Sequence, residues 1–444
     1  MIATTQVISE VPPIIAVQSR APALLYRAFV FPLKFVWGML FCQSLLGSIL
    51  VVGWTYRLAQ RVALKFWWSR RAYSERGITL DQFLSASERT KPHQHWPNWF
   101  LQQNFRETIR SPERTAPDLR DSPAEVLSTL LSSLRQNFWI GLRAITNTWV
   151  LTLPACVFWW FGWYDGWNNS FNKGYEQAPV GPLISIFGIV LFIAAMFYVP
   201  LAQARQAVTG EWRSFFQFRL VWRIVRARWI SNVALASLYS LLALPLNVLK
   251  TSPTFQSATN PALTNLTDLQ VLKHLDSYFF FCAMVMLPAY VILRLLAARI
   301  YASGILALLQ TGKIQPAELA PLEFGTLQRL GLLETRPNQG RHFFVRFITW
   351  TSTRVGRIAS TFALALIWFT FVAQIYVAEF LKYHSGLGWM NQPLVQVPWF
   401  HYVPARLKSP WSDIAFAIVV WLLASVVARA TQAFCSRRSQ HLAT

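Results

Sequence analysis

Seven apolar segments without any Asp, Glu, Lys, Arg or His dominate the sequence, and each is 15 to 22 residues long. A helix needs about 20 mostly apolar residues to cross roughly 30 Å of hydrocarbon, and in lipid only helices and closed barrels satisfy their own backbone. No alternating barrel pattern is present in these segments. The sequence therefore predicts an all-α, polytopic transmembrane helix bundle of about seven spans, at residues 35–54, 144–163, 180–201, 230–249, 278–293, 358–378 and 414–428.

The composition supports this class. Hydrophobic residues make up 54% of the 444 residues and charged residues 14%, whereas soluble proteins are about 25% charged. This composition argues against a soluble enzyme, and the net charge of +22 is interpreted as a membrane feature rather than a nucleic-acid site. The four Cys residues are widely spaced and form no Cys-x-x-Cys pair, which argues against a disulfide or zinc framework.

The basic residues predict the orientation. Of the 41 Lys and Arg residues, 32 fall in residues 56–143, 202–229, 294–357 and 429–444, and six fall in the three alternate connections. The positive-inside rule places the first group in the cytoplasm. We therefore expect a bacterial plasma (inner) membrane protein with a cytoplasmic C-terminus.

The first span has an alternative. Arg20, Arg27 and Lys34 precede residues 35–54, and such charge favours an inside N-terminus. In that case the segment is re-entrant or interfacial and six crossings remain. Seven crossings are favoured because the run is 20 residues long and uncharged.

The chain divides into alternating membrane and connecting parts. These are an N-terminal segment (1–34), the first span (35–54), a basic cytoplasmic segment (55–143), a central membrane region (144–309) with an interfacial helix (211–229), a cytoplasmic segment (310–357), the last two spans (358–428) and a cytoplasmic tail (429–444).

The interfacial helix is basic on one stripe and aromatic on another. Such a helix lies at the headgroup level and attracts anionic lipid at about 1 kcal/mol per basic side chain, although it also fits a simple extension that anchors the fourth span. Arg205 and Arg294 end apolar runs and are expected to extend towards the headgroups. The residues predicted to face anionic lipid are Arg205, Arg213, Arg219, Arg223, Arg226 and Arg228.

Residues that carry chemistry are sparse. No His lies in a predicted span and no nucleophile or phosphate-binding motif is present, so we predict no catalytic, cofactor-binding or metal-binding residue. A candidate outer vestibule consists of Glu379, His384, His401 and Asp413, which fit solvated interface charges equally well. The Trp residues near the predicted outer boundaries, including Trp159, Trp389 and Trp399, are typical of an interfacial belt; an aromatic-lined site for a lipid tail, sugar or pigment is the alternative.

The stretch from Tyr198 to Phe216 reads YVPLAQARQAVTGEWRSFF. It resembles a family of uncharacterised bacterial multi-pass membrane proteins in which a span ends in Tyr-x-Pro-x-Ala-x-Ala-Arg, followed by a Gly-containing turn and a basic helix. The resemblance covers residues 180–309 and implies a membrane-protein class without an assigned activity.

Together these patterns predict a non-enzymatic integral membrane protein, a structural or partner-binding subunit. Its expected partners are anionic lipid headgroups and another membrane protein, with no cofactor and no nucleic acid. The alternative is a permease for an apolar or lipid-like solute, with Pro154, Pro245 and Pro288 as hinges and a cavity that reaches Gln43. A membrane-embedded enzyme built on the outer vestibule residues is the third hypothesis.

Overall fold

A computed structural model describes residues 35–72, 122–162, 180–263, 265–333, 343–382 and 386–401, together with single positions 32, 77, 80 and 83. These residues form helices joined by turns, without a strand, which confirms the all-α class for the described part of the chain. The long helices are α2 (Leu45–Ser69), α5 (Ser122–Phe161), α7 (Val180–Thr209), α9 (Trp229–Thr259), α10 (Asp268–Gln310) and α12 (Phe343–Lys382). The short elements are η3 (Trp212–Phe216), α8 (Phe218–Ala227), η4 (Pro261–Leu263), η5 (Pro316–Glu318), α11 (Pro321–Arg329) and α13 (Gly386–Met390).

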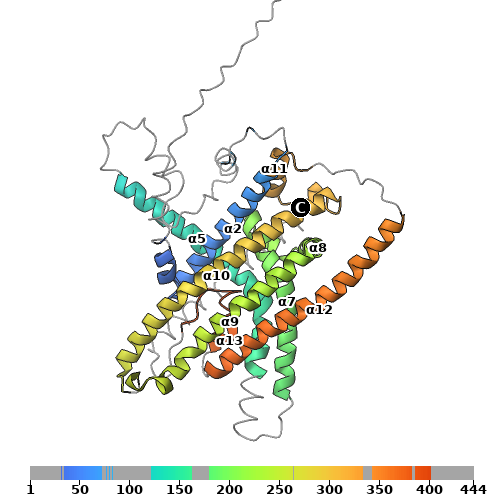
Figure 1. Cartoon of the computed structure of the whole chain (residues 1–444). Helices are drawn as coiled ribbons and strands as arrows, with labels where there is room; N and C mark the ends of the chain where they lie inside the picture. Colours follow the sequence, from blue (N-terminus) through green and yellow to red (C-terminus); the bar gives the residue numbers. More distant parts are fainter. Residues whose placement is uncertain are drawn as a thin grey trace, which may run out of the picture.

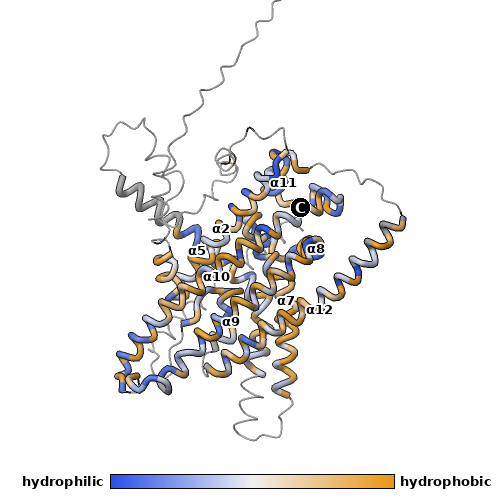
Figure 2. The backbone as a smooth tube through the Cα atoms, viewed as in Figure 1, coloured by the Kyte–Doolittle hydropathy of each residue, from blue (hydrophilic) through white to orange (hydrophobic). Residues whose placement is uncertain are grey.

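Five helices are long and apolar enough to cross a membrane: α5, α7, α9, α10 and α12. Figure 1 shows them packed side by side, with α8 and α11 at one end of the bundle and the turn between α9 and α10 at the other. Hydrophobic residues line the long helices, whereas hydrophilic residues concentrate at that turn and around α8 and α11 (Figure 2). We call the end that holds α8 and α11 the basic end. The length and apolar composition of these five helices are those of an integral membrane protein.

The segment predicted as the first span is divided. Its helix is interrupted at residues 42–44, and Ser44 then caps α2 by accepting a hydrogen bond from the Gly47 amide. Helix α2 runs in the direction of α10, because Gln43 lies beside Phe279 while the Trp67 indole donates to the Ala302 carbonyl at 3.0 Å. The segment predicted as the first span is therefore not one continuous helix, and whether it crosses the membrane stays a prediction. Residues 35–41 are helical, and after the interruption α2 begins at Leu45 and continues to Ser69.

Glycines let α2 approach α5 closely. A Cβ added at Gly53 would lie 1.7 Å from the Asn137 carbonyl oxygen, and one at Gly141 would lie 2.0 Å from that of Ile49. Small residues of this kind bring backbones together inside membranes. The seventh predicted span, 414–428, lies outside the described residues, and the number of crossings stays a prediction.

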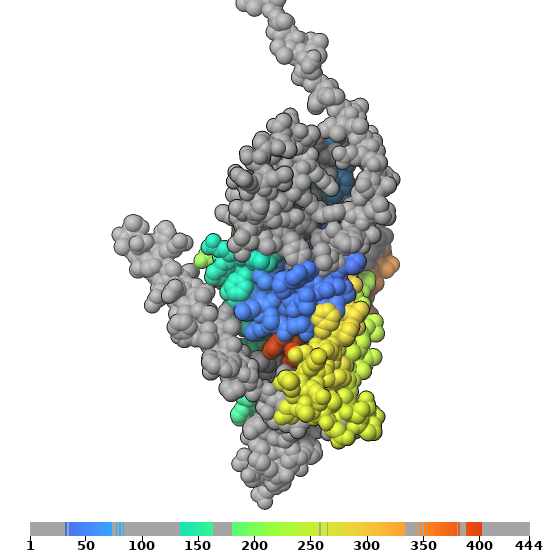
Figure 3. Space-filling model, turned by 90° about the vertical axis from the view of Figure 1, so that its left-hand side faces the viewer, coloured from blue at the N-terminus to red at the C-terminus, as the bar shows by residue number. Residues whose placement is uncertain are grey.

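Residues 391–400 form a non-helical segment that is buried almost throughout, which we call the inner loop. Its buried residues include Leu394, Val395 and Val397. Seen from the side in Figure 3, orange-red atoms from the end of the described chain lie between α2 (blue) and α10 (yellow). This contact agrees with the hydrogen bond from Ser48 to the Pro398 carbonyl and with the Phe279–Phe400 ring contact. Non-helical backbone at membrane depth requires partners from the surrounding protein.

Candidate functional site

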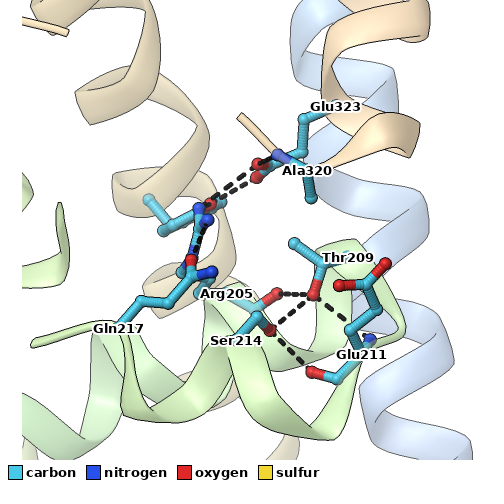
Figure 4. Close-up of polar contacts among 8 residues, drawn as sticks. Arg205, Thr209, Glu211, Ser214, Gln217, Ala320 and Glu323 are labelled. Atoms are coloured by element: carbon cyan, nitrogen blue, oxygen red, sulfur yellow. Dashed lines mark hydrogen bonds and ion pairs between the residues drawn. The ribbon is translucent and has the colours of Figure 1, made fainter. Parts of the chain in front are cut away.

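The basic end begins where α7 ends. Gly210 adopts a φ of +70°, which an L side chain rarely does, and this turn leads into η3 and α8. Thr209 and Ser214 bond to each other across the turn at 2.6 Å, and the Ser214 hydroxyl also donates to the Glu211 carbonyl (Figure 4). The Tyr198 hydroxyl donates to the Phe215 carbonyl. The sequence motif therefore builds a closed turn that fixes α8 against α7.

Arg205 lies inside this end of the bundle. Its side chain is 0% exposed, and its guanidinium lies 3.2 Å from the Glu323 carboxylate on α11, which is equally buried. The guanidinium donates to the Tyr301 hydroxyl and to the Gln217 amide oxygen, each at 2.6 Å. Glu323 also accepts from Tyr301 and, at 3.1 Å, from the Ala320 amide (Figure 4). The prediction that Arg205 faces lipid headgroups is wrong, because Glu323 and Tyr301 supply partners in the interior.

The other five predicted arginines separate into two groups. Arg223 pairs with Glu318 at 2.7 Å, and half-buried Arg228 donates to the Ser303 carbonyl at 3.1 Å, so both hold α8 against neighbouring segments. Arg213, Arg219 and Arg226 are exposed.

Helix α8 has two distinct faces. Leu220, Val221, Ile224 and Val225 are buried on its inner face. The opposite face therefore points away from the bundle. The Arg226 guanidinium lies 5.6 Å from the centre of the Trp222 ring. The exposed face therefore combines cations with aromatic rings, as a helix at a headgroup level does.

An apolar groove adjoins this exposed face. It has a volume of about 390 Å³ and lies between α5, α7 and α8. Pro154, Leu191, Ala194 and Ala195 line it within the bundle, and Phe218 and Trp222 line it on α8. A second apolar groove of about 650 Å³ is lined by residues of α5 that include Trp149, Pro154 and Phe158.

Two of the four predicted outer vestibule residues, Glu379 and His401, lie in the part of the chain that the structure describes. Glu379 is buried in contact with the Lys250 ammonium, where α9, α12 and α13 meet, so its predicted exposure is wrong. Gly388 provides room for this pair, because an added Cβ would lie 2.0 Å from a Glu379 carboxylate oxygen. His401 lies 3.2 Å from Asp276 on α10. His384 and Asp413 lie outside the described residues.

Arg294 is a further buried cation, and the expectation that its side chain extends to the membrane surface is wrong. Its guanidinium donates to the Tyr239 hydroxyl and the Leu394 carbonyl at 2.9 Å, and to the Val395 carbonyl at 2.5 Å. It also lies 4.4 Å from the centre of the Tyr290 ring. The partners of Arg294 are therefore aromatic residues and the inner loop.

Amide side chains complete the support of the inner loop. Gln203 on α7 donates to the Val395 carbonyl at 3.0 Å, and Asn391 donates to the Val397 and Trp399 carbonyls at 3.0 and 2.7 Å. Trp389 is buried against Trp159. The interfacial-belt interpretation is therefore wrong for these two Trp residues, because neighbouring helices cover them.

Within the described ranges, no three His, Cys, Asp or Glu side chains are grouped as metal ligands would be. Comparison of the chain with family models, with curated proteins and with solved structures gives no match. The site is therefore interpreted from its own geometry.

Proposed function

We propose that the chain is a non-enzymatic, partner-binding subunit of a bacterial inner membrane, with its basic end and C-terminus on the cytoplasmic side. The excess of Lys and Arg at that end supports the orientation. The resemblance carried by residues 198–216 supports membership of the uncharacterised bacterial membrane-protein family.

The proposal rests on the contacts that the buried charged side chains make. Six charged side chains are buried in the described part of the bundle, and all of them bond to other protein groups: Arg57, Arg205, Lys250, Arg294, Glu323 and Glu379. Intramembrane ionisable residues often mark transport or proton pathways, but here they connect helices to each other and to the inner loop. Binding is accordingly assigned to the surfaces of the bundle.

The permease alternative requires a solute-sized space near Gln43. The Gln43 amide instead donates to the Met39 carbonyl at 3.0 Å, and Met39, Cys42 and Phe279 around it are buried. The cavity beside Lys250 has a volume of about 10 Å³, which suits a single water at most. These observations favour a binding role over transport.

The test is native mass spectrometry of the full chain extracted gently from its own membrane. We expect a second protein in a fixed ratio to the chain. A harsher detergent that releases this protein while the chain stays folded provides the control for non-specific aggregation. Recovery of the bare chain with one selectively retained small molecule would overturn the proposal and favour the permease.

A further inference from the structure

We propose that the groove between α5, α7 and α8 is a binding site for one anionic phospholipid, with an acyl chain along the groove and the phosphate beside Arg219 and Arg226. This inference deepens the proposed function, because it rests on the assignment of the basic end to the headgroup level. It commits to a bilayer lipid as the occupant.

The shape of the groove follows from small side chains. Ala194 and Ala195 on α7 leave room along its floor, while Leu191 on α7 and Pro154 on α5 also line it. Its lining is almost wholly apolar and its volume is about 390 Å³. Transfer of a CH₂ group from water to an apolar environment is favourable by about 0.8 kcal/mol. A lipid tail gains little of this free energy in the groove, because it already lies in hydrocarbon. Apolar contact therefore positions a chain in the groove but does not select one lipid over another.

Selection comes from the end of the groove at α8. Phe218 and Trp222 line that end, and the Tyr198 ring stacks on Phe218 at a centroid distance of 4.8 Å. Arg226 lies over Trp222, and Arg219 is on the same exposed stripe of α8, three residues before Trp222 and seven before Arg226. A phosphate at the end of a tail in the groove would thus meet two guanidinium groups, and Arg forms paired hydrogen bonds with phosphate oxygens.

The proposal predicts a preference for headgroup charge that depends on both parts of the site. Each basic side chain near an anionic lipid contributes about 1 kcal/mol, and about 1.4 kcal/mol corresponds to a tenfold change in affinity. The double variant Arg219→Gln/Arg226→Gln is therefore expected to bind phosphatidylglycerol about 30-fold more weakly. Its affinity for phosphatidylcholine with the same acyl chains should stay within about threefold of the parent chain.

The experiment is lipid titration of the purified full chain, read by native mass spectrometry, with these two lipids. The charge control is Arg299→Gln/Lys273→Gln, which removes two exposed cations from α10. The groove variant is Ala194→Phe, which fills the floor, and its control is Leu183→Phe at an exposed α7 position away from the groove. We expect the Arg219→Gln/Arg226→Gln variant and Ala194→Phe each to lose the phosphatidylglycerol molecule that the parent chain binds most tightly. Both control variants should retain that molecule.

The outcomes separate the two proposals. If Ala194→Phe retains the lipid while the arginine variant loses it, the groove is overturned and a basic surface remains. If the charge control weakens binding as much as the arginine variant, the site is overturned in favour of a general charge effect. The partner-subunit proposal stands or falls separately, on the protein recovered with the chain from its own membrane.

Discussion

The buried ion pair between Arg205 and Glu323 gives the sharpest test of how the basic end is held together. Both side chains are 0% exposed, and they connect α7 to α11. Removal of one partner of a buried pair costs about 3–5 kcal/mol, because the other charge is left buried without compensation. Replacement of both partners by apolar residues of similar size is often close to neutral.

We therefore expect Arg205→Met and Glu323→Leu each to lower the free energy of unfolding by about 3–5 kcal/mol. The double variant should lose less than the sum of the two, with a coupling of about 2 kcal/mol or more. It still leaves the Tyr301 hydroxyl without its two charged partners, so we do not expect full recovery. Reversible unfolding of the full chain in mixed micelles, followed by Trp fluorescence, measures all four free energies.

The exposed pair Arg223–Glu318 supplies the matched control. Its atoms lie 2.7 Å apart, closer than the buried pair, but its side chains are 42% and 40% exposed. Water screens such a pair, so the same cycle with Arg223→Gln and Glu318→Gln should give a coupling of about 0.2–1 kcal/mol. A coupling free energy for Arg205 and Glu323 no larger than that of this control would refute the argument that burial strengthens their interaction.

Three further predictions concern the interior. Arg294→Gln should lower the free energy of unfolding by about 3 kcal/mol, because charged hydrogen bonds to two carbonyls and to Tyr239 are lost; an unchanged unfolding curve would contradict this. Gly53→Leu should abolish recovery of a monodisperse protein in size-exclusion chromatography, whereas Gly325→Ala, which meets no atom within 4 Å, should have no effect. Buried Cys156 should react with a maleimide only after denaturation, as monitored by mass spectrometry.

The long helices were predictable because their signal is local. The predicted span 180–201 matches the beginning of α7, yet the helix continues to Thr209. The apolar run ends where Gln203, Arg205 and Gln206 begin, but all three are buried by other parts of the bundle. Hydrophobicity therefore predicts the part of a helix that contacts lipid. It underestimates the length of a helix that continues among other protein segments.

The burial of Arg205 and Arg294 could not be predicted from the sequence, for a related reason. An Arg after an apolar run fits equally well with a side chain that extends to the headgroups and with one that turns inward. The choice depends on partners that are distant in sequence: Glu323 follows Arg205 by 118 residues, and Leu394 follows Arg294 by 100. One sequence without its relatives contains no local sign of either contact.

The inner loop shows how these two cases connect. Residues 391–400 fall between the last two predicted spans, which predicted an external connection, but such a segment can be buried when other helices supply hydrogen bonds. Arg294 and Gln203 supply donors from α10 and α7, and the nearby Lys250–Glu379 pair joins α9 to α12. The charges that would mark a transport pathway thus stabilise an irregular segment. Arg219 and Arg226 are exposed instead, which is why we propose that binding takes place at the surface of α8.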